Sequence, residues 1–475
     1  MKPAFYPRLA WMGLKKNARL YVPYLLSCAF MAAVLYVICC LAAAPALYVV
    51  NGKPNGSGTT TVQLVMTLGS VVISVFTVLF LFYTNSFLLR RRKKEFGLYS
   101  VLGMDRGALG AILLWETLMA AAFTLIAGLS LGVLLSYLSQ TALRRLLGLS
   151  AAAFAVSFTA VKQCIVTFAV IFALLYLRGV LSLRHTQGAA LLKSENVGER
   201  PPKSQWLLVL PGLAPLLSAY FIAATIKDPV QAMLLFFVAV IMVILATYLL
   251  FISGSVTLCK TLQRNEKFYY QKRNFVSLSS LTYRMKRNGA GLASICILST
   301  MVLVMVASTA SLYFGADDAI SALAVQNHWQ AGEMAEIRAE FFSLYGSLFF
   351  LGILLRALFL FATLLMLYYK QVVEGYEDAA RFAIMQRVGM TKRDIRESVN
   401  AQMLLIFLLP LAAAALHLGF AQPMVWQILQ LFGIQNLTLF LGVTAAALLV
   451  FAALYCAMYR LTSNAYFHIV STQNA

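Results

Sequence analysis

The chain has 475 residues, of which 61% are hydrophobic and 12% are charged, and its formal net charge is +21. This composition excludes a soluble globular domain, because runs of about 20 apolar residues recur and each can cross a hydrocarbon core of ~30 Å. A transmembrane β-barrel would show alternating segments of ~10 residues instead. The sequence therefore predicts an all-α integral membrane protein.

The apolar runs predict about ten transmembrane helices. They are expected at residues 20–43, 63–89, 107–137, 154–181, 206–226, 230–253, 289–312, 343–369, 399–420 and 438–460. The first run follows basic residues and resembles a signal peptide, but its length favours a retained first span. An even number of spans places both termini on the same side of the membrane.

Lys and Arg are concentrated on one side of this topology. With the N-terminus inside, 31 of the 38 basic residues fall in the inner segments 1–19, 90–106, 178–203, 254–288, 370–398 and 460–475. Because basic loops mark the cytoplasmic side, we expect both termini in the cytoplasm. Charge confined to short loops between spans also argues against a nucleic-acid partner.

Two inner segments have similar sequences at an offset of 286 residues. Phe96 to Met104 reads FGLYSVLGM, and Phe382 to Met390 reads FAIMQRVGM. Each mixes charge with apolar residues at helical spacing and ends in Gly-Met, where glycine can terminate a helix. We name residues 95–104 the first connector and residues 377–390 the second connector.

An amphipathic helix on the inner face can insert its apolar side into a groove on a partner. Two matched copies therefore predict two equivalent docking sites. The residues expected to contact the partner are Glu95, Phe96, Gly97, Leu98, Gly103, Met104, Glu377, Asp378, Arg381, Phe382, Gly389 and Met390.

A second pair of similar segments supports an internal repeat. Leu14-Lys15-Lys16-Asn17 precedes the first span and Met285-Lys286-Arg287-Asn288 precedes the seventh, so spans 1–4 and 7–10 form two half-repeats around a central pair. The expected organisation is a cytoplasmic amphipathic segment at 1–19, a four-span unit at 20–181, a two-span insertion at 206–253, a second amphipathic segment at 254–288, and a four-span unit at 289–460 with a short extracellular insert at 313–342.

Polar residues inside spans are functional candidates because they are costly in the membrane. Glu116 lies in the third span, and its counterpart at the same offset is Gln402, so the halves differ there. An interhelical hydrogen bond or a cap near the inner surface is the simpler interpretation of Glu116. A hydrogen-bonded interhelical histidine is the simpler interpretation of His417.

Four basic residues form a second candidate group. Arg356 lies in the middle of the eighth span, where an unpaired Arg costs at least ~2.5–3.5 kcal/mol on insertion scales. Arg144, Arg145 and Lys162 lie toward the outer leaflet, where snorkelling to anionic headgroups is the simpler interpretation. The alternative is a joint site for a pyrophosphate-bearing lipid, because guanidinium groups bind phosphate bidentately.

The sequence contains no motif of a soluble enzyme. It has no GxxxxGK[ST] loop to cradle ATP, no HExxH and no GxSxG. Its seven cysteines include no CxxC pair and are typical of apolar packing residues. We therefore predict no catalytic residues, no metal site and no cofactor bound by this chain.

The connectors and their surroundings resemble the FtsX-like permeases of ABC transporters, specifically the bacitracin-resistance (Bce-type) group. The motif from Tyr368 to Asp378 carries the resemblance, and it continues through Met385 to Met390, Pro410 and His417. The segment from Arg92 to Met104 resembles the sequence motif that follows the second span in the wider FtsX-like family.

This resemblance implies a bacterial cell-membrane protein with a separate ATPase subunit, two copies per permease, which holds ATP and magnesium and drives the spans mechanically. It implies resistance to, or export of, bacitracin-like antimicrobial peptides, or release of a cell-wall lipid intermediate, with membrane lipids and a membrane histidine kinase as further partners. Relatives carry a large extracellular domain between spans 7 and 8, where this chain has only residues 313–342.

Two other classes stay open. A secondary transporter would show broken spans at matching positions of its two halves, but Pro211 and Pro215 fall in the fifth span, outside the repeat. A sensory permease would control a kinase rather than move a substrate, and the short outer segment suits this class.

Overall fold

The computed structural model describes residues 5–43, 49–50, 53–54, 59–147, 156–184, 206–265, 272–327, 331–387, 389 and 391–472. Apart from a hairpin of two two-residue strands, β1 (Val49–Val50) and β2 (Lys53–Pro54), the regular elements in these ranges are helical. This confirms the predicted all-α class.

Nine helices in the described ranges are long and apolar enough to cross a membrane. The fifth predicted span is slightly too short to be counted among them, because its apolar part covers only Val209–Thr225. The whole helix α8 (Trp206–Thr225) has 20 residues, which corresponds to about 30 Å and equals the thickness of a hydrocarbon core. The difference from the predicted ten is therefore one short helix.

The chain forms two compact units, Met1–Gly198 with Gln330–Leu358, and Glu199–Trp329 with Phe359–Ala475. The first unit contains α1 (Phe5–Lys16), α2 (Ala18–Ala42), α4 (Thr59–Val101), α5 (Arg106–Leu147) and α6 (Phe158–Arg184). The second contains α8, α9 (Pro229–Leu249), the π-helical turn η1 (Leu250–Gly254), α10 (Ser255–Arg264), α12 (Lys272–Phe314), α13 (Ala316–Asn327), α15 (Lys392–Leu431) and α16 (Leu437–Thr472). Helix α14 (Ala331–Arg387) contributes to both.

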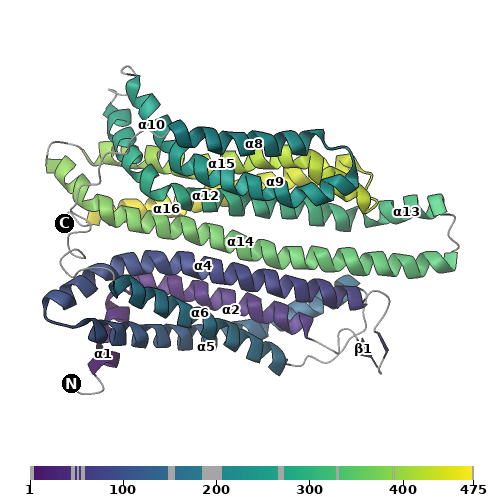
Figure 1. Ribbon diagram of the computed structural model, residues 1–475, viewed down its shortest axis with the longest axis horizontal. Helices are drawn as coiled ribbons and strands as arrows, with labels where there is room; N and C mark the ends of the chain where they lie inside the picture. Colours follow the sequence, from purple (N-terminus) through teal and green to yellow (C-terminus); the bar gives the residue numbers. More distant parts are fainter. Residues whose placement is uncertain are drawn as a thin grey trace. The chain divides into compact units, whose positions relative to one another are not determined.

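Helix α2 is the central helix of the first unit and packs against α4, α5 and α6 (Figure 1). It crosses α5 at a Gly-x-x-x-Gly pair. A Cβ on Gly128 would lie 2.5 Å from the Cβ of Ala32, and one on Gly132 would lie 2.9 Å from the ring of Tyr36. Small residues let membrane helices approach this closely, so the glycines fix the contact between α2 and α5.

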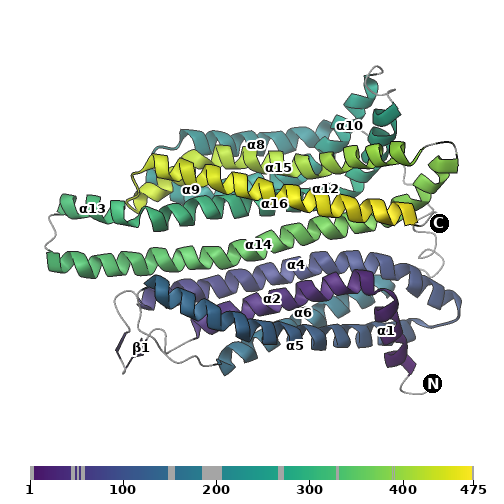
Figure 2. The ribbon, with the colours of Figure 1, turned by 180° about the vertical axis from the view of Figure 1, so that it is seen from behind.

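In the second unit, α12 packs against both α15 and α16, and α8 packs against α9 (Figure 2). Asp228 caps the start of α9, because its carboxylate accepts from the backbone N–H of Val230 at 3.2 Å and Pro229 occupies the first helical position. Gly289 lets α12 cross η1, since a Cβ there would lie 2.6 Å from the carbonyl oxygen of Phe251.

The connectors are not separate interfacial helices. The first is the end of the 43-residue α4, and the second is the end of the 57-residue α14. Each span thus continues as one helix into its connector.

Candidate functional site

The first connector ends in a sharply defined turn. Gly103 has φ +91°, a left-handed conformation that other residues adopt only with strain. The N–H of Met104 donates to the carbonyl of Tyr99 at 3.0 Å, which closes the helix end. Asp105 then caps α5, accepting from the backbone N–H groups of Gly107 and Ala108 at 3.2 Å.

One face of the first connector is buried in the bundle. Phe96 is fully buried in an apolar cluster, with Met104 packed against it. The other members of the cluster are Ala10, Leu109, Ile112, Leu113 and Leu183. The opposite face is apolar but exposed, because Leu98, Val101 and Leu102 point outward at i, i+3 and i+4 spacing.

The second connector repeats this pattern at the offset of 286 residues. Phe382 is buried like Phe96, and Ile384 is 62% exposed where Leu98 is 51% exposed. Gly389 has φ +105°, matching Gly103. Each connector therefore combines a buried Phe, an exposed aliphatic residue and a left-handed terminal glycine.

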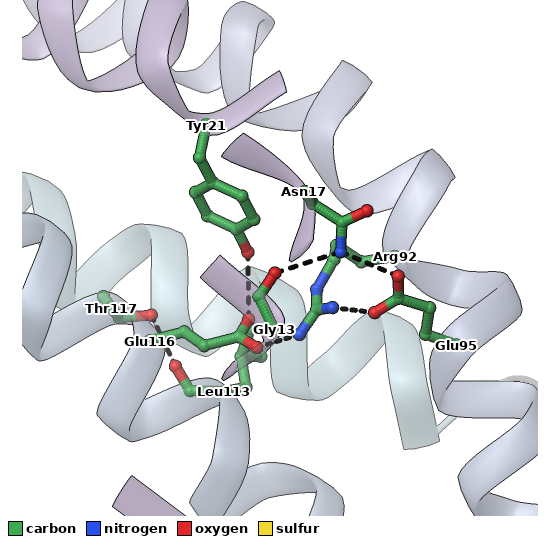
Figure 3. A network of polar contacts seen from close by, with 8 residues as sticks. All are labelled: Gly13, Asn17, Tyr21, Arg92, Glu95, Leu113, Glu116 and Thr117. Atoms are coloured by element: carbon green, nitrogen blue, oxygen red, sulfur yellow. Dashed lines mark hydrogen bonds and ion pairs between the residues drawn. The ribbon is translucent and has the colours of Figure 1, made fainter. Parts of the chain in front are cut away.

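A buried charge cluster lies just before the first connector (Figure 3). The guanidinium of Arg92 forms ion pairs with Glu95, one turn further along α4, and with Glu116 on α5. It also lies 5.1 Å from the ring centre of Phe96, within range of a cation–π interaction. Arg92 thus links the start of the connector to α5.

The N-terminal helices complete this cluster. The hydroxyl of Tyr21 on α2 donates to Glu116 at 3.0 Å, and the amide of Asn17 donates to Glu95 at 2.7 Å. Gly13 on α1 makes room, because a Cβ there would lie 2.9 Å from Nη2 of Arg92. Residues from α1, α2, α4 and α5 therefore meet around one guanidinium (Figure 3).

The second unit has a buried carboxylate at the equivalent position. Asp378 stands where Arg92 stands in the first half, and it accepts a hydrogen bond from the hydroxyl of Tyr466 on α16. In the sequence, the pair Arg92 and Glu95 corresponds to Asp378 and Arg381. The charges of the i, i+3 pair are reversed between the halves.

Four residues singled out in the sequence have no described side chain. Three are predicted contact residues of the second connector, Glu377, Arg381 and Met390, and the fourth is Gln402, the predicted counterpart of Glu116 inside a span. Gly97 is buried beside Phe96 on the first connector. The predictions for these four side chains stay predictions.

The four basic residues of the second candidate group lie in the first unit. Arg356 donates from Nε to the carbonyl of Gly352 at 2.8 Å and lies 5.3 Å from the ring centre of Phe349. Lys162 and Arg145 are exposed, and Arg144 is half-buried. Arg356 thus obtains hydrogen bonds within its own helix, so its burial does not require a lipid phosphate.

His417 connects three helices of the second unit. Its Nδ1 lies 2.5 Å from the hydroxyl of Tyr220 on α8, and its Nε2 lies 3.1 Å from the hydroxyl of Thr247 on α9. The histidine itself is on α15. Both ring nitrogens therefore have partners.

Sequence reasoning did not single out Arg92, Tyr21, Asn17 or Gly13. Arg92 sits within the run Arg90 to Lys94, in which nothing distinguishes one cation from the next. The available signal was the helical spacing, since Arg92, Glu95 and Phe96 share one face.

Comparison with known proteins finds a family match in the first half of the chain and relatives that are named as permeases. Residues 67–187 match the family described as FtsX-like permease C-terminal. An uncharacterised ABC transporter permease, YvcS of Bacillus subtilis, is 28% identical over 297 residues, covering 62% of this chain and 45% of the relative. The bacitracin export permease protein BceB of Halalkalibacterium halodurans is 28% identical over 320 residues, covering 65% and 48%.

The BceB protein of Bacillus subtilis is 25% identical over 324 residues, covering 65% of this chain and 49% of the relative. The chain spans about half the length of the curated relatives it matches. It is an integral membrane protein, and its residues 67–187 are similar to the FtsX-like permease family. More particularly, it is homologous to the Bce-type bacitracin export permeases and to YvcS.

Proposed function

We propose that this chain is the membrane subunit of an ABC transporter and that each connector docks one copy of a separate ATPase subunit. The matched connectors carry the proposal, since burial, exposure and terminal glycine conformation repeat at equivalent positions. A twofold-repeated surface suits two copies of the same partner. The cytoplasmic placement of both connectors rests on the distribution of Lys and Arg.

The charge cluster provides a route from the connector to the spans. A displacement of the first connector moves Arg92, which is ion-paired to Glu116 on α5. Separating a buried pair exposes an uncompensated charge to a medium that cannot hydrate it. The pair therefore stays together, and α5 and α2 move with the connector.

Native mass spectrometry of the permease co-expressed with its ATPase tests the docking. We expect two ATPase copies on the unaltered chain, one on Leu98→Glu or Ile384→Glu, and none on the double variant. Leu461→Glu on α16 is a matched control, because Leu461 is also an exposed aliphatic residue. Two bound copies on the double variant would refute the docking proposal.

The cargo proposed from the relatives is a bacitracin-like peptide, or the cell-wall lipid that such a peptide captures. Two of the relatives are named bacitracin export permeases. Arg144, Arg145, Lys162 and Arg356 stay the proposed lipid-phosphate site. Replacing Arg356 and Lys162 by Gln should abolish protection from bacitracin while ATPase binding persists, and full protection would exclude this site.

A sensory permease is the second candidate, favoured by the short segment between α12 and α14. That segment contains the 12-residue helix α13, which is too small to form a core of its own. Another protein, such as a membrane histidine kinase, would then supply ligand recognition. Bacitracin resistance that requires the kinase but persists when the ATPase cannot hydrolyse ATP would favour signalling over transport.

A further inference from the structure

The second unit contains a large apolar cavity between α8, α9, α12 and α15. Its volume is about 490 Å³, within the ~300–1,000 Å³ typical of pockets that bind small ligands. Its walls come from the middle parts of α9, α12 and α15, the same parts that are apolar enough to cross a membrane. The cavity therefore lies at the depth of the hydrocarbon core.

The cavity lining carries no formal charge, and its polar groups have partners within the protein. His417 is bonded to Tyr220 and Thr247 through its two ring nitrogens. The hydroxyls of Thr300 and Ser308 each donate to a carbonyl of α12 at 2.9 Å. Nothing in the wall requires water or a polar ligand, and apolar cavities of this kind stay dry and take up apolar molecules.

The wall is held open by the side chains around His417. The histidine joins α15 to α8 and α9, and Tyr220 stacks on Phe420 with ring centres 4.0 Å apart and planes within 6°. These contacts fix α8, α9 and α15 relative to one another on three sides of the cavity. The site is therefore formed before a ligand arrives, which lowers the cost of binding.

The cavity is reached from the side. Phe237, Met301 and Phe420 line it and are also exposed on the surface of the unit. At this depth the surrounding medium is lipid, so a ligand enters laterally from the bilayer.

A partner helix fits this space poorly. A helix with its side chains is ~10–12 Å across and rises 5.4 Å per turn, so one turn fills roughly 400–600 Å³. The cavity would hold about a single turn, whereas a hydrocarbon chain is far thinner. We propose that this cavity binds one hydrocarbon chain of a membrane lipid, a function beyond ATPase docking.

Photolabelling tests the proposal on the full chain in lipid nanodiscs. The probe is phosphatidylglycerol with a diazirine near the middle of one acyl chain, and the labelled residues are mapped by mass spectrometry. We expect several-fold more adducts on Met301 and Val304 than on Leu234, an exposed α9 residue outside the cavity. Equal labelling of all three would overturn the proposal.

Filling variants give the matched control. Val240→Trp on α9 fills the cavity, whereas Ile241→Trp adds the same ring to an exposed neighbour that does not line it. Adducts on Met301 should fall several-fold in the first and persist in the second. Ser308→Phe fills the same space from α12 and keeps the test valid if Val240→Trp fails to fold.

Two further outcomes would overturn the proposal. One is unchanged labelling of Met301 in both filled variants. The other is an unlabelled cavity in the unaltered chain together with a photocrosslink from Met301 to a second polypeptide, which would assign the cavity to a partner helix. ATPase copy number should be the same in all these variants, so failure here is distinguishable from failure of the docking proposal.

Discussion

Removal of Glu116 should destabilise the first unit more than removal of any other carboxylate in the charge cluster. Arg92 and Glu116 are each only 3% exposed, so the cation left behind cannot be hydrated. The Glu95 side chain is 25% exposed and can be partly replaced by water. The two Arg92 pairs are therefore unequal, although both are ion pairs.

The magnitude follows from what Arg92 retains in each variant. Removing one partner of a buried ion pair costs ~3–5 kcal/mol. In Glu116→Ala, Arg92 keeps Glu95, so we expect about 3 kcal/mol, the lower end of that range. In Glu95→Ala, Arg92 keeps its buried partner, so we expect about 1 kcal/mol or less, as for partly exposed pairs.

Thermal unfolding of the detergent-solubilised chain, monitored by size-exclusion chromatography, measures the difference in Tm between these variants. For a unit of this size, 3 kcal/mol corresponds to a fall in Tm of roughly 6–12 °C. The double variant Arg92→Leu, Glu116→Leu should recover most of this loss, because an apolar pair of similar volume replaces a buried ion pair at little cost. Equal Tm values for Glu116→Ala and Glu95→Ala, or a double variant below both single variants, would refute the reasoning.

Three glycine substitutions test other parts of the first unit, with Gly110→Ala as their common control because a Cβ at Gly110 meets open space. Gly13→Ala should displace the Arg92 guanidinium and lower Tm by several degrees, and an unchanged Tm would contradict the packing in Figure 3. Gly128→Leu should lower the yield of monodisperse protein, because its side chain cannot fit against Ala32. Gly103→Ala should cost ~1–2 kcal/mol through its left-handed φ and weaken ATPase binding, whereas normal binding would show that the turn does not position the connector.

The sequence predicts those features that depend on local pattern. Hydropathy is summed along a helix, so the spans and their order follow from it, with α8 as the marginal case. The connectors are recognisable in the sequence because the chain repeats them, and Phe96 and Leu98 fall on opposite faces at helical spacing. Charge distribution alone also suggests which side of the membrane each loop occupies.

Contacts between distant residues could not be predicted in the same way. Arg92 meets Glu116 only because the chain reverses direction at Gly103, between α4 and α5. The angle of that turn decides which of the five cations from Arg90 to Lys94 faces Glu116. His417 lies 197 residues from Tyr220 and 170 from Thr247. Such pairings depend on how helices rotate about their axes, which a single sequence does not specify.

The two half-repeats have similar residues at an exposed position of the connector and opposite charges at a buried position near it. Leu98 and Ile384 both present an exposed aliphatic side chain, as two copies of one partner would require. Inside, the buried charge is positive at Arg92 and negative at Asp378.

A second position, in the helix after each connector, also differs between the two half-repeats. Glu116, which can pair with a cation, corresponds to Gln402, whose amide can donate to a carboxylate but does not repel it. In the sequence, reversal of the charge from Arg92 to Asp378 is accompanied by the change from Glu116 to Gln402 in the following helix. If each connector docks one ATPase copy as proposed, the same ATPase movement acts on two bundles that differ in buried charge, positive at Arg92 and negative at Asp378.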